Sequence, residues 1–129
     1  MKYHSEDHHK YSLKAHLIFV IKYRKKLIQG NLKIKLKEIL FKQQTSKFTI
    51  EIMETDLDHI HILIDYPPTI SVSSIVKKLK QMSTFYIWKY YNLEKYFWKE
   101  KTFWSDGYFA CSTGDASTET IKKYIESQG

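Results

Sequence analysis

The segment DHIHILID, residues 58–65, has the side-chain alternation of a β-strand. Successive side chains of a strand point to opposite faces, so His59, His61 and Leu63 share one face and the intervening isoleucines form the other. Two imidazoles therefore project side by side from a strand that its apolar face holds in place. Two interpretations are open here: a metal site, because ring nitrogens spaced i, i+2 can converge on one ion, or ordinary surface or core histidines.

Three further strands are expected around this one. The run from Tyr11 to Arg24 is apolar on both faces in its middle, which is typical of a central strand covered on both sides. Phe48, Ile50 and Ile52 alternate with polar residues and predict a hairpin partner for the histidine strand, after a polar turn at 55–58. Residues 108–113 predict the fourth strand, which Gly114-Asp115 breaks.

Helical spacing of apolar residues predicts three helices. The first covers about 31–45 and has a basic outer side. The second is a long helix that ends near Tyr90, with N-cap candidates Ser71, Ser73 and Ser74. The third covers about 118–128, after the N-cap candidate Ser117. The aromatic stretch 93–107 lacks periodicity and reads as a packed loop, with base stacking as its less favoured use.

The order strand, helix, strand, strand, helix, strand, helix predicts an α+β ferredoxin-like sandwich. Its antiparallel sheet would carry helices on one face, with an additional C-terminal helix, and the first and histidine strands would be central. We expect residues 1–10 to form a flexible tail and residues 11–129 a single domain.

Composition limits the class of protein. The 129 residues are 43% hydrophobic and 16% aromatic, which argues against disorder. No uninterrupted apolar run is long enough to span a membrane, and the charged start lacks the apolar middle of a signal peptide, so we expect a cytoplasmic protein. Cys111 is the single cysteine, and its apolar setting predicts a small buried residue rather than a nucleophile.

Charge indicates a polyanionic partner. The net charge of +7 and the pI near 9.3 favour nucleic acid, although all but one of the cations are lysine and genome composition can produce the same excess. The segment Lys22-Tyr23-Arg24-Lys25-Lys26 surrounds an aromatic ring with cations and could contact phosphates and a base, or be a solvated strand end. Lys77 and Lys78, near the start of the long helix, are further candidate DNA contacts.

The last helix would present two functional groups together. Tyr124 and Gln128 are i, i+4 neighbours on one face, while Ile121 and Ile125 can anchor the helix to the sheet. A tyrosine on a short helix and a terminal glutamine are also common as packing and solvated residues.

Four segments in order carry a family resemblance. They are His59-Ile60-His61, the strand exit at 19–24, the stretch 103–109 (FWSDGYF) and the ending 123–128 (KYIESQ). Together they resemble the single-tyrosine transposases of the HUH endonuclease superfamily, found in small insertion sequences of the 200/605 type, and the match runs from about Tyr11 to Gln128.

The resemblance implies a reaction and its residues. His59, His61 and Gln128 would hold Mg²⁺ or Mn²⁺, and Tyr124 would attack single-stranded DNA to leave a 5′-phosphotyrosine and a free 3′-hydroxyl. A tyrosine hydroxyl with a pKa near 10 is a weak nucleophile, which agrees with a need for a metal ion.

The resemblance also implies partners. These would be DNA hairpins near the element ends and a second copy of the chain, in a homodimer with shared active sites. The alternative function is a non-catalytic hairpin-binding protein derived from such a transposase. A structural-metal hydrolase is less favoured, because no acidic or cysteine cluster completes a zinc site.

Overall fold

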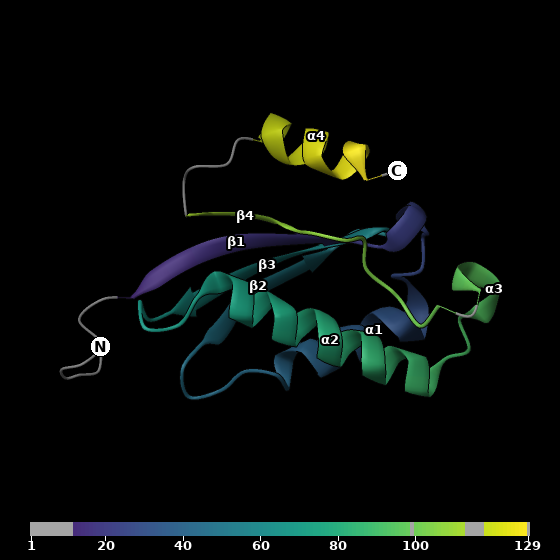
Figure 1. Ribbon diagram of the computed structural model, residues 1–129, viewed down its shortest axis with the longest axis horizontal. Helices are drawn as coiled ribbons and strands as arrows, with labels where there is room; N and C mark the ends of the chain where they lie inside the picture. The colour runs from purple at the N-terminus through teal and green to yellow at the C-terminus, as the bar shows by residue number, and fades with distance from the viewer. Residues whose placement is uncertain (1–11, 99, 113–117, 129) are drawn as a thin grey trace.

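The computed structural model describes residues 12–98, 100–112 and 118–128, and within them one antiparallel sheet has the strand order β2-β3-β1-β4 (Figure 1). The strands are β1 (Leu13–Val20), β2 (Thr49–Thr55), β3 (His59–Tyr66) and β4 (Phe109–Ser112). This order confirms the predicted α+β ferredoxin-like sandwich. The first strand and the histidine strand, β1 and β3, lie at the centre of the sheet as expected.

Two long helices cover one face of the sheet. α1 (Gly30–Phe41) and α2 (Val72–Tyr90) lie on the same side, whereas α4 (Thr118–Ser127) lies on the other side, next to β4 (Figure 1). Ser71 is the N-cap of α2, because its hydroxyl accepts a hydrogen bond from the Ser74 amide at 3.1 Å. A short helix, α3 (Glu94–Phe97), interrupts the stretch that we predicted to be a loop throughout.

The hydrophobic core fills the space between the sheet and these two helices. Alternate residues of the central strands point into it, and so do the apolar stripes of α1 and α2. The fully buried members from the sheet are Leu17, Phe19, Ile60, Ile62 and Ile64, and those from the helices are Leu36, Leu40, Leu79 and Ile87. The opposite face of β3 is therefore the one that carries His59 and His61.

One prediction about β2 was wrong. Ile50 pairs with Ile64 and Ile52 with Leu63, so the register shifts between them as in a β-bulge. Ile50 is 7% exposed in the core, whereas Ile52 is 44% exposed and lies on the histidine face. Simple alternation predicts that both isoleucines lie on one face of the strand. The extra residue interrupts this alternation and turns Ile52 to the other face.

Other differences are smaller. β1 ends at Val20, and Lys22–Arg24 form a 3₁₀ turn in which Tyr23 and Arg24 have positive φ. Cys111 is partly exposed rather than buried. The expected tail, the break at residues 114–115 and the N-cap at residue 117 lie outside the described residues. Within the described ranges, no helix is both long and apolar enough to cross a membrane.

The bulge makes Ile50 and Ile52 a matched pair for a stability test. We expect Ile50→Ala to lower the free energy of unfolding by about 2–4 kcal/mol, as for a buried aliphatic side chain. Ile52→Ala should change it by less than about 1 kcal/mol, because that side chain is largely exposed. Urea unfolding followed by circular dichroism measures both, and equal losses would contradict the bulge.

Candidate active site

The two histidines of β3 lie on the face of the sheet that faces away from α1 and α2. His59 pairs with Val20 and His61 with Ile18 across the antiparallel ladder to β1. Paired residues share a face, and both imidazoles are partly exposed there, with 21% and 26% of their side-chain surface accessible. The backbone thus presents two imidazoles on a surface that a ligand can reach.

A buried carboxylate orients the first imidazole. His59 Nδ1 lies 2.8 Å from Asp58 Oδ1, and Arg24 Nε donates to Asp58 Oδ2 at 3.1 Å. Burial alone would raise the pKa of Asp58, but the hydrogen bonds from His59 and Arg24 outweigh it and hold this pKa below its ordinary value of 3.8. With Nδ1 held by the carboxylate, the Nε2 lone pair of His59 is the one left for a ligand.

A third histidine contacts the second imidazole. His16 Nδ1 lies 2.7 Å from His61 Nε2, and Glu54 lies 3.6 Å from His61 Nδ1. Burial, followed by the repulsion of a charged His16, lowers the pKa of His61, so this imidazole is neutral at pH 7. Each histidine of the pair therefore has a carboxylate on its Nδ1 side, and His16 faces the Nε2 of His61.

Tyr124 lies over the edge strand on the same face. Its ring is 5.6 Å from the ring of Phe109, which pairs with Ile18 and so lies on the histidine face of β4. Burial raises the pKa of Tyr124 above 10.0, so its hydroxyl is protonated at neutral pH. β1 lies between this tyrosine and the histidines of β3.

The side chain of Gln128 is hydrogen-bonded to the adjacent residue: its Nε2 donates to Ser127 Oγ at 3.1 Å. Among the residues that the structure describes, no hydrogen bond joins Tyr124 or Gln128 to His59 or His61. That part of the chain also contains no group of three His, Cys, Asp or Glu side chains placed to hold a metal ion. The structure thus brings the two histidines together, and it places the tyrosine on the same face over β4, with β1 between them.

The predicted DNA contacts divide into two kinds. Arg24 faces inward to Asp58 and supports the site, whereas Tyr23 is 53% exposed, with Lys22 Nζ 5.7 Å from its ring centre. Lys26 and Lys77 are exposed, and Lys25 and Lys78 are partly so. These lysines and Tyr23 remain available to a polyanion.

Three residues of the site were not singled out from the sequence: His16, Glu54 and Asp58. His16 alternates with Ile18 and Val20, which could have placed it on the face opposite Leu17. Its contact with His61 depends on the register of two distant strands, for which the sequence has no local signal. Asp58 directly precedes His59, and its partner Arg24 was taken as a DNA contact only.

The lowered pKa of Asp58 predicts a pH-dependent contribution to stability. A carboxyl whose pKa is lower in the folded protein stabilises the fold above its unfolded value, and this contribution is lost as pH falls through the folded pKa. We therefore expect Asp58→Asn to destabilise the protein at pH 7 and to have a smaller effect at pH 3, below the ordinary pKa of 3.8. Urea titrations at both pH values test this, with exposed Asp106→Asn as control, and an effect of equal size at both would contradict it.

Comparison with known proteins places this chain in a family. The family model "Transposase IS200 like" matches residues 9–128. A transposase for insertion sequence element IS200 from Salmonella typhimurium is 32% identical over 123 residues, which cover 94% of this chain and 80% of that protein. The ISDra2 transposase TnpA of Deinococcus radiodurans is 31% identical over 120 residues, 92% of this chain and 85% of the relative.

Solved structures show the same architecture. A crystal structure described as a transposase from Deinococcus radiodurans R1 superposes with a TM-score of 0.86 at 25% identity and covers 98% of both chains. A REP-associated tyrosine transposase bound to a REP hairpin has a TM-score of 0.58 at 13% identity, over 95% of this chain and 69% of that one. Since the family model covers nearly all of its length and two relatives exceed 30% identity, the chain belongs to the IS200-like transposase family.

Proposed function

We propose that this transposase cleaves and rejoins single-stranded DNA at insertion-sequence ends through a covalent bond between Tyr124 and a 5′-phosphate. The observation that carries the proposal is the sheet face opposite α1 and α2, on which His59 and His61 stand side by side and Tyr124 lies over β4. Membership of the family supports it. The charge of +7 and the exposed lysines suit a polyanionic substrate.

His59, His61 and Gln128 are the residues that would hold a divalent cation, Mg²⁺ or Mn²⁺. The hydrogen bond between His59 Nδ1 and Asp58 leaves Nε2 of His59 as the ligand atom, and Glu54 lies 3.6 Å from Nδ1 of His61. The amide oxygen of Gln128 would supply the kind of ligand that Mg²⁺ and Mn²⁺ prefer. When bound, the ion would polarise the scissile phosphate and neutralise charge that develops on it. His16 would have to release Nε2 of His61 for this to happen.

The chain's own chemistry is a transesterification. Tyr124 Oη attacks phosphorus and loses its proton, the bond from phosphorus to the 3′-oxygen breaks, and that oxygen takes up a proton. The products are a 5′-phosphotyrosine and a free 3′-hydroxyl. Because the tyrosyl ester conserves the phosphodiester bond energy, a 3′-hydroxyl of another strand can reverse the step and join DNA without ATP.

We further propose that the working form is a homodimer bound to hairpins at the element ends. Tyr124 is separated from the histidines of its own chain by β1, since it lies over β4 and they lie on β3. A site that combines the histidines of one subunit with the tyrosine helix of the other would bring these groups together.

The covalent intermediate can be detected directly. Incubation with labelled single-stranded DNA that carries the element-end hairpins, in Mn²⁺, should give a protein–DNA adduct on a denaturing gel. Tyr124→Phe should abolish the adduct because it removes the attacking oxygen, and Tyr90→Phe, an exposed tyrosine of α2, should retain it.

Mixing variants tests the shared site. If the tyrosine acts across the dimer, Tyr124→Phe mixed with His61→Ala should recover part of the adduct, because one of the two sites in a mixed dimer is then intact. Tight hairpin binding without any adduct in the wild-type protein would favour the non-catalytic hairpin-binding protein instead.

Binding of the metal ion can be measured without DNA cleavage. His59→Ala and His61→Ala should each weaken Mn²⁺ binding by about tenfold or more, as measured by calorimetry or electron paramagnetic resonance. His16→Ala is the matched control: it should bind Mn²⁺ at least as tightly as wild type, because it frees Nε2 of His61. Loss of affinity in His16→Ala alone would instead make His16 a ligand.

A further inference from the structure

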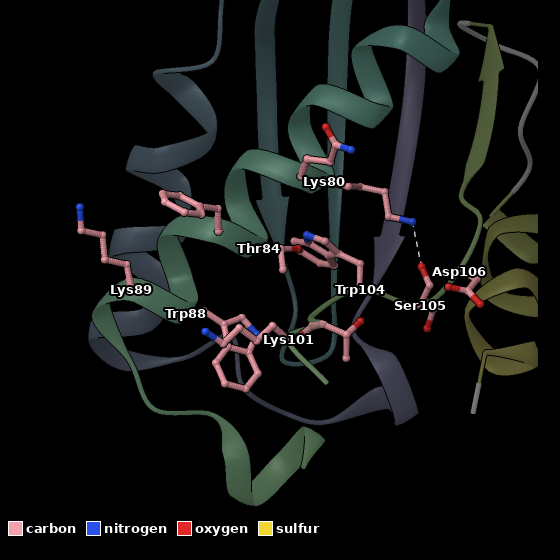
Figure 2. A pocket seen from close by; sticks show the side chains of 11 residues that line it. Lys80, Thr84, Trp88, Lys89, Lys101, Trp104, Ser105 and Asp106 are labelled. Carbon is pink, nitrogen blue, oxygen red and sulfur yellow. Dashed lines mark hydrogen bonds between the residues drawn. The ribbon is translucent and has the colours of Figure 1, made fainter. Parts of the chain in front are cut away.

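A pocket of about 720 Å³ lies between α2 and residues 101–106 (Figure 2). Phe85, Trp88 and Trp104 supply its aromatic lining, and Lys89 and Lys101 stand at its rim. Its volume is in the range of about 300–1,000 Å³ that is usual for small-ligand sites. Neither the sheet site nor the proposed reaction uses this pocket.

The two indoles of the pocket are fixed by the protein itself. Trp88 Nε1 donates to the Thr102 carbonyl at 2.7 Å, and Trp104 Nε1 donates to Ser83 Oγ at 2.9 Å. Because both N–H groups are satisfied, neither ring offers a free donor. Trp104 is 4% exposed and forms the buried base of the pocket, whereas Trp88 is partly exposed and presents carbon surface. Phe85 is 60% exposed, so its ring adds solvent-accessible aromatic surface to the lining.

Lys80 connects the two walls of the pocket by hydrogen bonds. Lys80 Nζ donates to the carbonyls of Ser105 (Figure 2) and Gly107, at 2.8 and 2.7 Å, so it links α2 to the segment across the pocket. Lys89 and Lys101 are exposed, and no salt bridge within the described ranges engages either of them. The pocket thus combines rigid aromatic surface with cations that can contact phosphate.

The pocket is also connected to the basic segment at 22–26. Trp104 forms a backbone bridge with Ile21, and the Lys22 amide donates to the Phe103 carbonyl at 2.9 Å. A nucleic-acid strand with its phosphates on Lys22, Lys25 and Lys26 would therefore pass next to the aromatic lining.

We propose that this pocket binds one unpaired base of single-stranded DNA by stacking, with Lys89 and Lys101 contacting the flanking phosphates. The proposal rests on the proposed function in that both assume a single-stranded DNA substrate. Stacking suits any base, because every base has an aromatic face, so the pocket contributes affinity rather than sequence choice.

The test separates base stacking from charge. An oligothymidylate of about 20 nucleotides and an abasic oligomer of equal length are compared as ligands of the Tyr124→Phe protein, by fluorescence anisotropy at one salt concentration. Adding Phe85→Ala should weaken binding of oligothymidylate by about fivefold or more and leave binding of the abasic oligomer unchanged. Tyr90→Ala, which removes an exposed aromatic of the same helix outside the pocket, should weaken neither.

Three results of the binding assay would overturn the proposal. They are unchanged binding of oligothymidylate by Phe85→Ala, an equal loss on both oligomers, and a loss with Tyr90→Ala as large as with Phe85→Ala. A dimer in light scattering that Phe85→Ala dissociates would also overturn it, because a second copy of the chain would then cover the pocket. If an adduct forms through Tyr124 but binding does not depend on the bases, only the pocket proposal fails. If binding depends on the bases but no adduct forms, only the proposed cleavage chemistry fails.

Discussion

The pairing of β1 with β3 is the constraint on which the rest of the molecule depends. The two strands pair along eight residues each, from Leu13 opposite Tyr66 to Val20 opposite His59. A slip of one residue would turn the imidazoles toward α1 and α2 and expose the isoleucines between them. Burial of Ile60, Ile62 and Ile64 therefore fixes the histidines on the face opposite α1 and α2, so the core that stabilises the fold also positions the site.

The charged network at the start of β3 shows how the site is supported. A nearly buried carboxylate such as Asp58 is costly unless donors satisfy it, and here Arg24 and His59 do so. Arg24 reaches it from a turn in which Tyr23 and Arg24 have φ of 61° and 51°, a conformation that costs about 1 kcal/mol or more per residue. The arginine of the basic segment thus stabilises the site, and the lysines around it are left for a polyanion.

Much of this arrangement could be predicted from alternation and periodicity. The isoleucines at 60, 62 and 64 determine which face of β3 carries the histidines, and the apolar run of β1 makes it central. The bulge between Ile50 and Ile52 could not be predicted, because isoleucine suits either face and no glycine marks it. The short α3 and the contact of His16 with His61 depend on tertiary packing and strand register, which have no local signal.

Ile21 joins the two regions to which we assign DNA chemistry and DNA binding. Its amide donates to the Asp58 carbonyl at 2.9 Å, and its backbone bridges to Trp104. Asp58, which orients His59, and Trp104, which lines the pocket, therefore both contact the backbone of Ile21. Ile21 is fully buried and directly precedes the basic segment. A strand of DNA that passes around this end of β1 could place a base in the pocket and continue toward the histidine face. Since both attachments are backbone hydrogen bonds to a rigid strand end, the spacing between the two regions is set by the fold and not by flexible side chains.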